Sequence, residues 1–183
     1  MKKLAAETVL TSRTLTTMRD EPVGLFADDV THLQFLRFAG CPICNLHLRS
    51  FVNRNDELRA AGIREVAVFH STREELLKYE ADLPFDVIAD PHKALYREFG
   101  VEVSARAIID PRAWVSILRG ILTSLRDAMR GRAPLAPLSP AGGELGLPAD
   151  LLIAPDGTIV AVKYGRHAAD QWSVDEVLAL SQR

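Results

Sequence analysis

The sequence predicts a single α/β domain, in which helices connect the strands of one sheet. Between residues 30 and 100, short apolar stretches alternate with longer stretches rich in helix formers. Nearer the end of the chain, two β-prone stretches flank Pro155-Asp156-Gly157, and a helical pattern follows them. The 183 residues suffice for one domain with a sizeable core.

The composition is typical of a soluble globular protein, with 48% hydrophobic and 25% charged residues. A net charge of −2 argues against nucleic acid as a partner. No apolar run approaches the length of a membrane span, and Glu7 and Thr8 interrupt the apolar stretch near the N-terminus before it resembles a signal peptide. We therefore expect a cytoplasmic protein, and in a reducing cytosol a close cysteine pair is more often catalytic than structural.

An N-terminal extension, residues 1–29, precedes the regular part of the chain. Thr8–Thr11 and Thr14–Thr17 are β-prone and predict one or two short strands, and Glu21–Gly24 predicts a turn. A central strand is expected over about 30–38, where the stretch from Leu33 onward is apolar apart from two side chains, Gln34 and Arg37. Such a stretch is typical of a strand buried on both faces.

A long helix is expected over 42–61, since this stretch is rich in helix formers and is followed by Gly62. The strand–helix–strand unit that ends at 63–69 implies two parallel strands with a right-handed crossover. The elements expected next are a helix from a capping box at Ser71–Glu74 to about Glu80, a strand over 85–90, and a helix over 92–99 stopped by Gly100.

Residues 104–147 are interpreted as an insertion that contains a basic amphipathic helix. Its apolar residues follow helical spacing: Trp114, Ile117, Leu118, Ile121, Leu122, Leu125 and Met129. Its basic residues are Arg112, Arg119, Arg126, Arg130 and Arg132, and a flexible connection with Pro134, Pro137, Pro140, Gly142 and Gly143 follows. Packing on its own domain is the favoured role of this helix. A dimer contact or a lid over the cysteines comes next, and an anionic membrane surface is least favoured.

The chain is expected to close with a hairpin and a helix. Residues 150–154 and 158–162 flank the turn sequence Pro155–Gly157. Ser173–Glu176 is a second capping box, which opens a helix to about Ser181.

The only two cysteines, Cys41 and Cys44, lie two residues apart where the central strand gives way to the long helix. Pro42 fits the first helical position, which makes Cys41 the N-cap. A helix N-terminus favours thiolate over thiol, and in such motifs the cysteine pKa falls from about 8.5 to roughly 3.5–7.5. Cys44 lies one turn farther along the same face. We therefore interpret Cys41 as the nucleophile and Cys44 as the resolving thiol.

Other interpretations of this motif remain, although a redox-active dithiol is favoured over them. The two cysteines could instead be buried structural thiols, but burial alone does not require this spacing. Cys41, Cys44 and His47 have the spacing of half a zinc site, but there is no second cysteine pair to complete it. Haem attachment needs a histidine directly after Cys44, where Asn45 stands. We expect no bound cofactor and no metal.

The order of the elements, with Cys-x-x-Cys opening the first helix, resembles the thioredoxin fold. The resemblance implies a three-layer α/β/α fold with a central mixed sheet. It also implies that Pro148, just before the terminal hairpin, is a cis-proline that faces the cysteines and presents backbone to the substrate. An ordinary trans proline is the alternative. Arg37, four residues before Cys41, is either a partner that holds the thiolate or a strand arginine that reaches solvent.

The stretch Phe35–Cys44 resembles the F-L-R-x-x-G-C-x-x-C signature of a peroxiredoxin-like branch related to selenoprotein U, within the alkyl hydroperoxide reductase/thiol-specific antioxidant superfamily. This resemblance covers about residues 30–180. Typical peroxiredoxins place Pro and Thr or Ser seven and three positions before the peroxidatic cysteine. Here those positions hold Gln34 and Phe38. The resemblance therefore carries over dithiol chemistry more firmly than peroxidase activity.

The resemblance implies a peroxiredoxin-like thiol–disulfide oxidoreductase of antioxidant type, in which Cys41 and Cys44 cycle between dithiol and disulfide while peroxide or disulfide substrates are reduced. The expected partners are a thiol protein or a low-molecular-weight thiol as electron donor, with a homodimer as a further option. The alternative function is a non-catalytic binding or redox-sensor module that uses the basic insertion helix as its contact surface.

Overall fold

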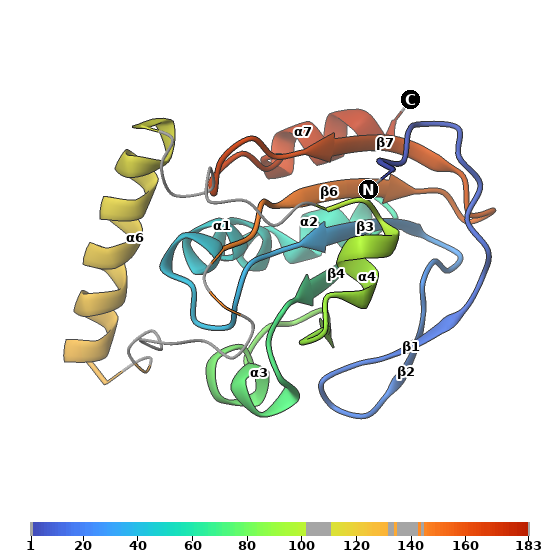
Figure 1. The fold of residues 1–183 in the computed structure, drawn as a ribbon. Coiled ribbons are helices and arrows are strands. Elements are labelled where there is room, and N and C mark those ends of the chain that lie inside the picture. Colours follow the sequence, from blue (N-terminus) through green and yellow to red (C-terminus); the bar gives the residue numbers. More distant parts are fainter. Residues whose placement is uncertain (1, 102–110, 132–133, 135–142, 144, 183) are drawn as a thin grey trace.

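A computed structural model describes the chain except residues 1, 102–110, 132–133, 135–142, 144 and 183. Its centre is a five-stranded sheet in the order β5-β4-β3-β6-β7 (Figure 1). Strands β3 (Val30–Phe35), β4 (Ile63–Phe69) and β5 (Asp86–Ala89) run parallel. Strands β6 (Ala149–Ile153) and β7 (Ile159–Tyr164) are antiparallel, and β6 pairs with β3. The sheet is mixed, as expected.

Helices cover one face of this sheet. They are α1 (Pro42–Asn53), α2 (Asn55–Ala60), α3 (Arg73–Tyr79) and α7 (Val174–Ser181). Each contributes buried apolar side chains to one core cluster, which also contains both cysteines. Burying this apolar surface is the main force that holds the helices on the sheet.

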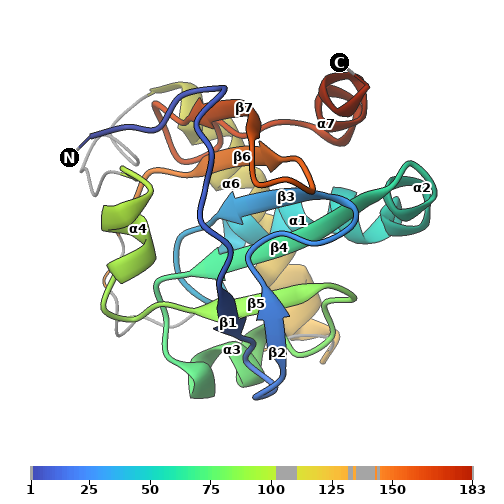
Figure 2. The same cartoon turned by 90° about the vertical axis from the view of Figure 1, so that its right-hand side faces the viewer.

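The opposite face is covered by α4 (Ala94–Glu98) and by a hairpin of β1 (Thr14–Thr16) and β2 (Pro22–Gly24) (Figure 2). A second core cluster lies between them and the sheet. The three-layer α/β/α prediction is therefore confirmed. The turn predicted at Glu21–Gly24 is wrong, because Pro22–Gly24 pairs with β1 instead.

Three predicted boundaries differ from the structure. The helix expected over 42–61 is two helices, because Arg54 leaves the helical conformation at φ −119° and ψ 20°. The central strand ends at Phe35 rather than at 38. The first capping box is formed by Thr72 and Glu75, one position later than predicted, because the Ser71 hydroxyl instead accepts a hydrogen bond from the Ala39 N–H.

The end of the chain agrees with the sequence prediction. Strands β6 and β7 form the hairpin, and Gly157 in its turn has φ +87°, a conformation that suits glycine. Ser173 and Glu176 form the second capping box, which opens α7.

The helix predicted from the apolar spacing is present as α6 (Pro111–Met129), which stands at the edge of the molecule beside α1 (Figure 1). Helix α6 thus packs on its own domain, as favoured, but its apolar side chains do not make this contact. A Cβ at Gly120 would lie 2.8 Å from the Pro42 carbonyl oxygen, whereas large apolar side chains of α6 are exposed. Most of the predicted connection after this helix lies outside the described residues. Within the described part of the chain, no helix is both long enough and apolar enough to span a membrane.

Candidate active site

Cys41 is the N-cap of α1, as predicted. Its backbone is extended, with φ −61° and ψ 118°, and Pro42 occupies the first helical turn. The Cys41 sulfur accepts a hydrogen bond from the Cys44 N–H at 3.4 Å. Gly40, just before it, has φ +75°, which lets the chain turn from β3 into the helix. One free N–H of the helix end therefore points at the sulfur, where it favours negative charge.

The two thiols are free, buried and adjacent. The Cys44 thiol donates to the Cys41 sulfur across 2.8 Å. Burial by itself would raise the pKa of Cys41, but the hydrogen bond from Cys44 and the charge of Arg37 outweigh it and lower that pKa to about 7. Burial and the neighbouring Cys41 raise the pKa of Cys44 well above its usual value. The pair therefore combines a thiol that is partly ionised at neutral pH with one that stays protonated.

Arg37 follows the end of β3 and is buried, with only 4% of its surface exposed. Its Nη1 lies 3.8 Å from the Cys41 sulfur, and its guanidinium stacks over the ring of Phe38 at 5.3 Å. Of the two alternatives for this arginine, the geometry matches the partner of a thiolate rather than a side chain in solvent.

Two residues that sequence reasoning missed hold the loop before Cys41. The Ala39 N–H donates to the Ser71 hydroxyl at 2.9 Å, and the Gly40 N–H donates to Glu80 Oε1 at 2.8 Å. Burial and the nearby charge of Cys41 raise the pKa of Glu80 to about 7. The hydrogen bond from the Gly40 N–H acts in the opposite direction but is outweighed. Because parallel strands end at the same edge of a sheet, the residues after β4 were candidates to meet this loop. Glu80 carried no such signal, since a glutamate at the predicted end of a helix is ordinarily exposed to solvent.

Pro148 directly precedes β6, as predicted, but the expected cis peptide bond is wrong: none occurs among the described residues. The Pro148 carbonyl accepts a hydrogen bond from the Gly165 N–H at 2.8 Å. The segment still lies close to the site. Leu147 belongs to the core cluster of the cysteines, and a Cβ at Gly146 would lie 3.9 Å from Arg37 Cγ.

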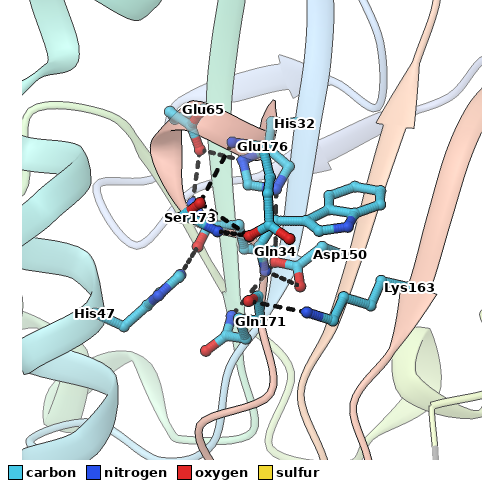
Figure 3. A network of polar contacts seen from close by, with 10 residues as sticks. His32, Gln34, His47, Glu65, Asp150, Lys163, Gln171, Ser173 and Glu176 are labelled. Carbon is cyan, nitrogen blue, oxygen red and sulfur yellow. Dashed lines mark hydrogen bonds and ion pairs between the residues drawn. The ribbon is translucent and has the colours of Figure 1, made fainter. Parts of the chain in front are cut away.

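A buried polar network lies beneath α1 and links three strands to that helix (Figure 3). His32 Nδ1 lies 2.8 Å from Glu65 Oε2, and its Nε2 lies 3.5 Å from Asp150 Oδ1. The Gln34 amide donates to Glu65 at 2.6 Å and its oxygen is 3.1 Å from His47 Nε2. His47 thus ties α1 to the sheet.

The protonation of this network follows from its charges. Burial opposes a charge on His32, but the carboxylates of Glu65 and Asp150 raise its pKa to about 9. Burial, together with the charges of His32 and Lys163, lowers the pKa of His47 to about 4. His32 therefore carries the charge and His47 is neutral at physiological pH. No cluster of three or more metal-ligating side chains is found in the part of the chain that the structure describes.

The fold is similar to those of several solved proteins. The peroxidoxin BcpB from Mycobacterium tuberculosis superposes with a TM-score of 0.67 at 14% identity, covering 98% of this chain and 97% of its own. A putative thiol:disulfide interchange protein DsbE from Chlorobium tepidum gives 0.60 at 17% identity, covering 98% and 99%. Peroxiredoxin Q from Xanthomonas campestris gives 0.62 at 17%, covering 93% and 89%. At these identities the likeness shows the fold alone.

The sequence comparisons give the family. No curated protein matches the chain. The family model described as AhpC/TSA antioxidant enzyme matches residues 50–167, a stretch that begins just after Cys44. The matched stretch runs from α1 to the segment after β7 and so covers most of the sheet that carries the dithiol. The chain belongs to the AhpC/TSA antioxidant enzyme family.

Proposed function

We propose that this protein is a thiol–disulfide oxidoreductase of antioxidant type, in which Cys41 and Cys44 alternate between dithiol and disulfide. The observation that carries the proposal is the surroundings of the Cys41 sulfur. It lies 3.4 Å from the Cys44 backbone nitrogen, 3.8 Å from Arg37 Nη1 and 2.8 Å from the Cys44 sulfur. A thiolate held by these donors and a resolving thiol within reach of it are the two requirements of dithiol exchange.

In the first step, the Cys41 thiolate attacks one sulfur of a substrate disulfide. The substrate S–S bond breaks, a mixed disulfide with Cys41 forms, and the departing thiolate takes up a proton. Glu80, whose pKa is about 7, lies in the same loop environment and is a candidate proton donor. The charge on Cys41 disappears in this step.

In the second step, Cys44 loses its proton and attacks the Cys41 sulfur, which forms the intramolecular disulfide and releases the remaining substrate thiol. The charge of Cys41 is one cause of the high pKa of Cys44. Because the mixed disulfide carries no charge, Cys44 ionises more readily at this stage than in the resting dithiol. A thiol protein or a low-molecular-weight thiol would then reduce the Cys41–Cys44 bond.

Substrate access requires movement, since Cys41 is fully buried. Helix α6 lies directly over the start of α1 at Gly120 and Pro42. The proposed cycle therefore includes a local displacement that exposes the sulfur, as is common where a buried site opens for its substrate.

Peroxide is the second substrate class of this proposal. There the Cys41 thiolate would attack a peroxide oxygen, giving a sulfenic acid and an alcohol or water, and condensation with Cys44 would release water. Neither Gln34 nor Phe38 supplies a hydroxyl for the peroxide, and Gln34 is engaged with Glu65 and His47. This favours disulfide exchange. We place the chain in the branch related to selenoprotein U on its Phe35–Cys44 motif, and we propose a cytoplasmic location.

Trapping tests the proposal. Cys44→Ser should accumulate mixed disulfides with an added protein disulfide, visible by mass spectrometry, whereas Cys41→Ser should trap none. Equal, slow labelling of both wild-type thiols by iodoacetamide would contradict the assignment of the nucleophile. Rapid mixing with hydrogen peroxide separates the substrates: disulfide formation no faster than oxidation of free cysteine would remove the peroxidase reaction from the proposal.

A further inference from the structure

Helix α6 exposes a continuous apolar face. Its members are Val115, Leu118, Ile121, Leu122, Leu125 and Met129, each at least 43% exposed and Met129 82% exposed. The recurring spacings of three and four place them within an arc of about 120° on the helix surface. We call this set the apolar arc of α6. Clustered exposed apolar side chains of this kind mark an interaction surface, whereas scattered ones do not.

The arc points away from the rest of the protein. Gly120 is the contact with α1, since a Cβ there would lie 2.8 Å from the Pro42 carbonyl oxygen. By helical geometry Gly120 lies roughly 160° from the centre of the arc. The packed side of α6 is therefore the small-residue side, and the arc is the side opposite to it. Figure 1 shows α6 at the outer edge of the molecule, next to α1.

A row of cations borders the arc. Arg119, Arg126 and Arg130 are exposed and follow one edge of it at spacings of seven and four. The stretch 111–132 contains five arginines and one aspartate, while the whole chain has a net charge of −2. Positive charge is thus concentrated on the same helix that exposes its apolar face, in a protein that is acidic elsewhere.

We propose that α6 is a membrane-surface helix, which lies in the plane of an anionic lipid bilayer with its apolar arc among the acyl chains. Its length of 19 residues is ordinary for such a helix, and it is not apolar enough to span the bilayer. Arginines at the edge of the arc can extend toward lipid phosphates while their stems remain in apolar surroundings. An anionic lipid surface matches both the apolar arc and the row of arginines along its edge.

Docking of α6 would bring the dithiol close to the bilayer, because the helix rests on Pro42, directly after Cys41. The body of α6 then lies between the cysteine site and the bilayer surface. Lipid binding by α6 would not depend on the substrate of the cysteines.

Vesicle sedimentation tests the proposal with the full chain. Binding is expected to vesicles of equal parts phosphatidylglycerol and phosphatidylcholine, to weaken as salt is added, and to be absent with phosphatidylcholine alone. Replacing Arg119, Arg126 and Arg130 together by Gln should weaken binding by about 100-fold, since each arginine near an anionic surface contributes about fivefold. Arg166→Gln, which removes a charge whose side chain is 79% exposed, is the matched control and should leave binding unchanged.

A second pair of variants tests the apolar component. Leu122→Asp should abolish vesicle binding without unfolding the protein, since this side chain is 58% exposed. Val9→Asp, at a position 68% exposed outside α6, should bind as the wild type does. Absence of binding to the anionic vesicles would overturn the proposal. So would a wild-type dimer that Leu122→Asp converts to a monomer without any vesicle binding, because the arc would then be an interface between two copies.

Discussion

Replacing Arg37 by Gln should raise the pKa of Cys41 and slow its reactions at neutral pH. The wild-type guanidinium lies 3.8 Å from the Cys41 sulfur, is almost completely buried, and is one of the causes that lower this pKa to about 7. Glutamine removes the charge while keeping a polar side chain of moderate length. The change therefore isolates the electrostatic contribution better than truncation to alanine would.

The distance sets the size of the effect. Two unit charges about 4 Å apart attract by about 1 kcal/mol in water and by about 4 kcal/mol at an effective dielectric of about 20. Because one pKa unit corresponds to about 1.4 kcal/mol, the pKa of Cys41 should rise by about 1 to 3 units. The fraction of thiolate at pH 7 would then fall from about one half to about one tenth or less.

The assay is the pH dependence of thiolate absorbance in the ultraviolet, supported by the rate of iodoacetamide labelling across the same pH range. The signal near neutral pH belongs to Cys41, because the pKa of Cys44 is raised well above its usual value. Arg54→Gln is the matched control. It removes the same charge at the far end of α1, about 18 Å along the helix, where salt screens the interaction.

An unchanged pKa of Cys41 in Arg37→Gln would refute the reasoning, provided that the variant retains the wild-type circular dichroism and unfolding midpoint. An equal rise in both variants would show that net charge, rather than the contact between Arg37 and the sulfur, controls the thiol.

Three further predictions concern groups around the dithiol. Glu80→Gln should lower the pKa of Cys41, because a nearby negative charge is lost, and thiol titration measures this. It should also stabilise the protein at pH 8, where the buried carboxylate is otherwise ionised, and urea unfolding measures that. A higher pKa of Cys41 in this variant would contradict the prediction. Gly120→Ala should speed iodoacetamide labelling of Cys41 several-fold, because the new Cβ, 2.8 Å from the Pro42 oxygen, displaces α6; an unchanged rate would show that α6 does not limit access. Protonation of His32 stabilises the fold fully below about pH 6.5 and this stabilisation is lost as pH rises to about 9. The unfolding free energy of wild type minus that of His32→Asn should therefore fall by about 3 kcal/mol across that window, as measured by urea unfolding at both ends.

Much of the site followed from local sequence. The N-cap position of Cys41 depends on Pro42 and on the change from an apolar strand to helix formers, all within a few residues. The capping box at Ser173 and Glu176 is equally local. Such features depend on hydrogen bonds and backbone conformations that neighbouring residues decide, so the pattern in the sequence is sufficient to predict them.

Features that depend on burial were harder to predict. Arg54, where the long helix breaks, bonds Asp175 far along the chain, and the capping box shifts to Thr72 because Ser71 bonds the distant Ala39. Glu80 illustrates the same limit, since its role comes from the Gly40 N–H, which is forty residues away. The sequence gives no indication of which of Glu74, Glu75 and Glu80 is buried.

The sequence by itself therefore determined the order of the elements, the start of the cysteine helix and the placement of two cysteines in its first turn. Only the tertiary structure decided what surrounds the Cys41 sulfur. Arg37 points inward to it, Glu80 accepts a hydrogen bond from the loop before it, and α6 packs over Pro42 with its apolar arc facing outward. The physical reason is that helical periodicity shows that a helix has an apolar side, but not which side meets the protein. In α6 the close approach at Gly120 settled that orientation, and it left the apolar arc facing outward.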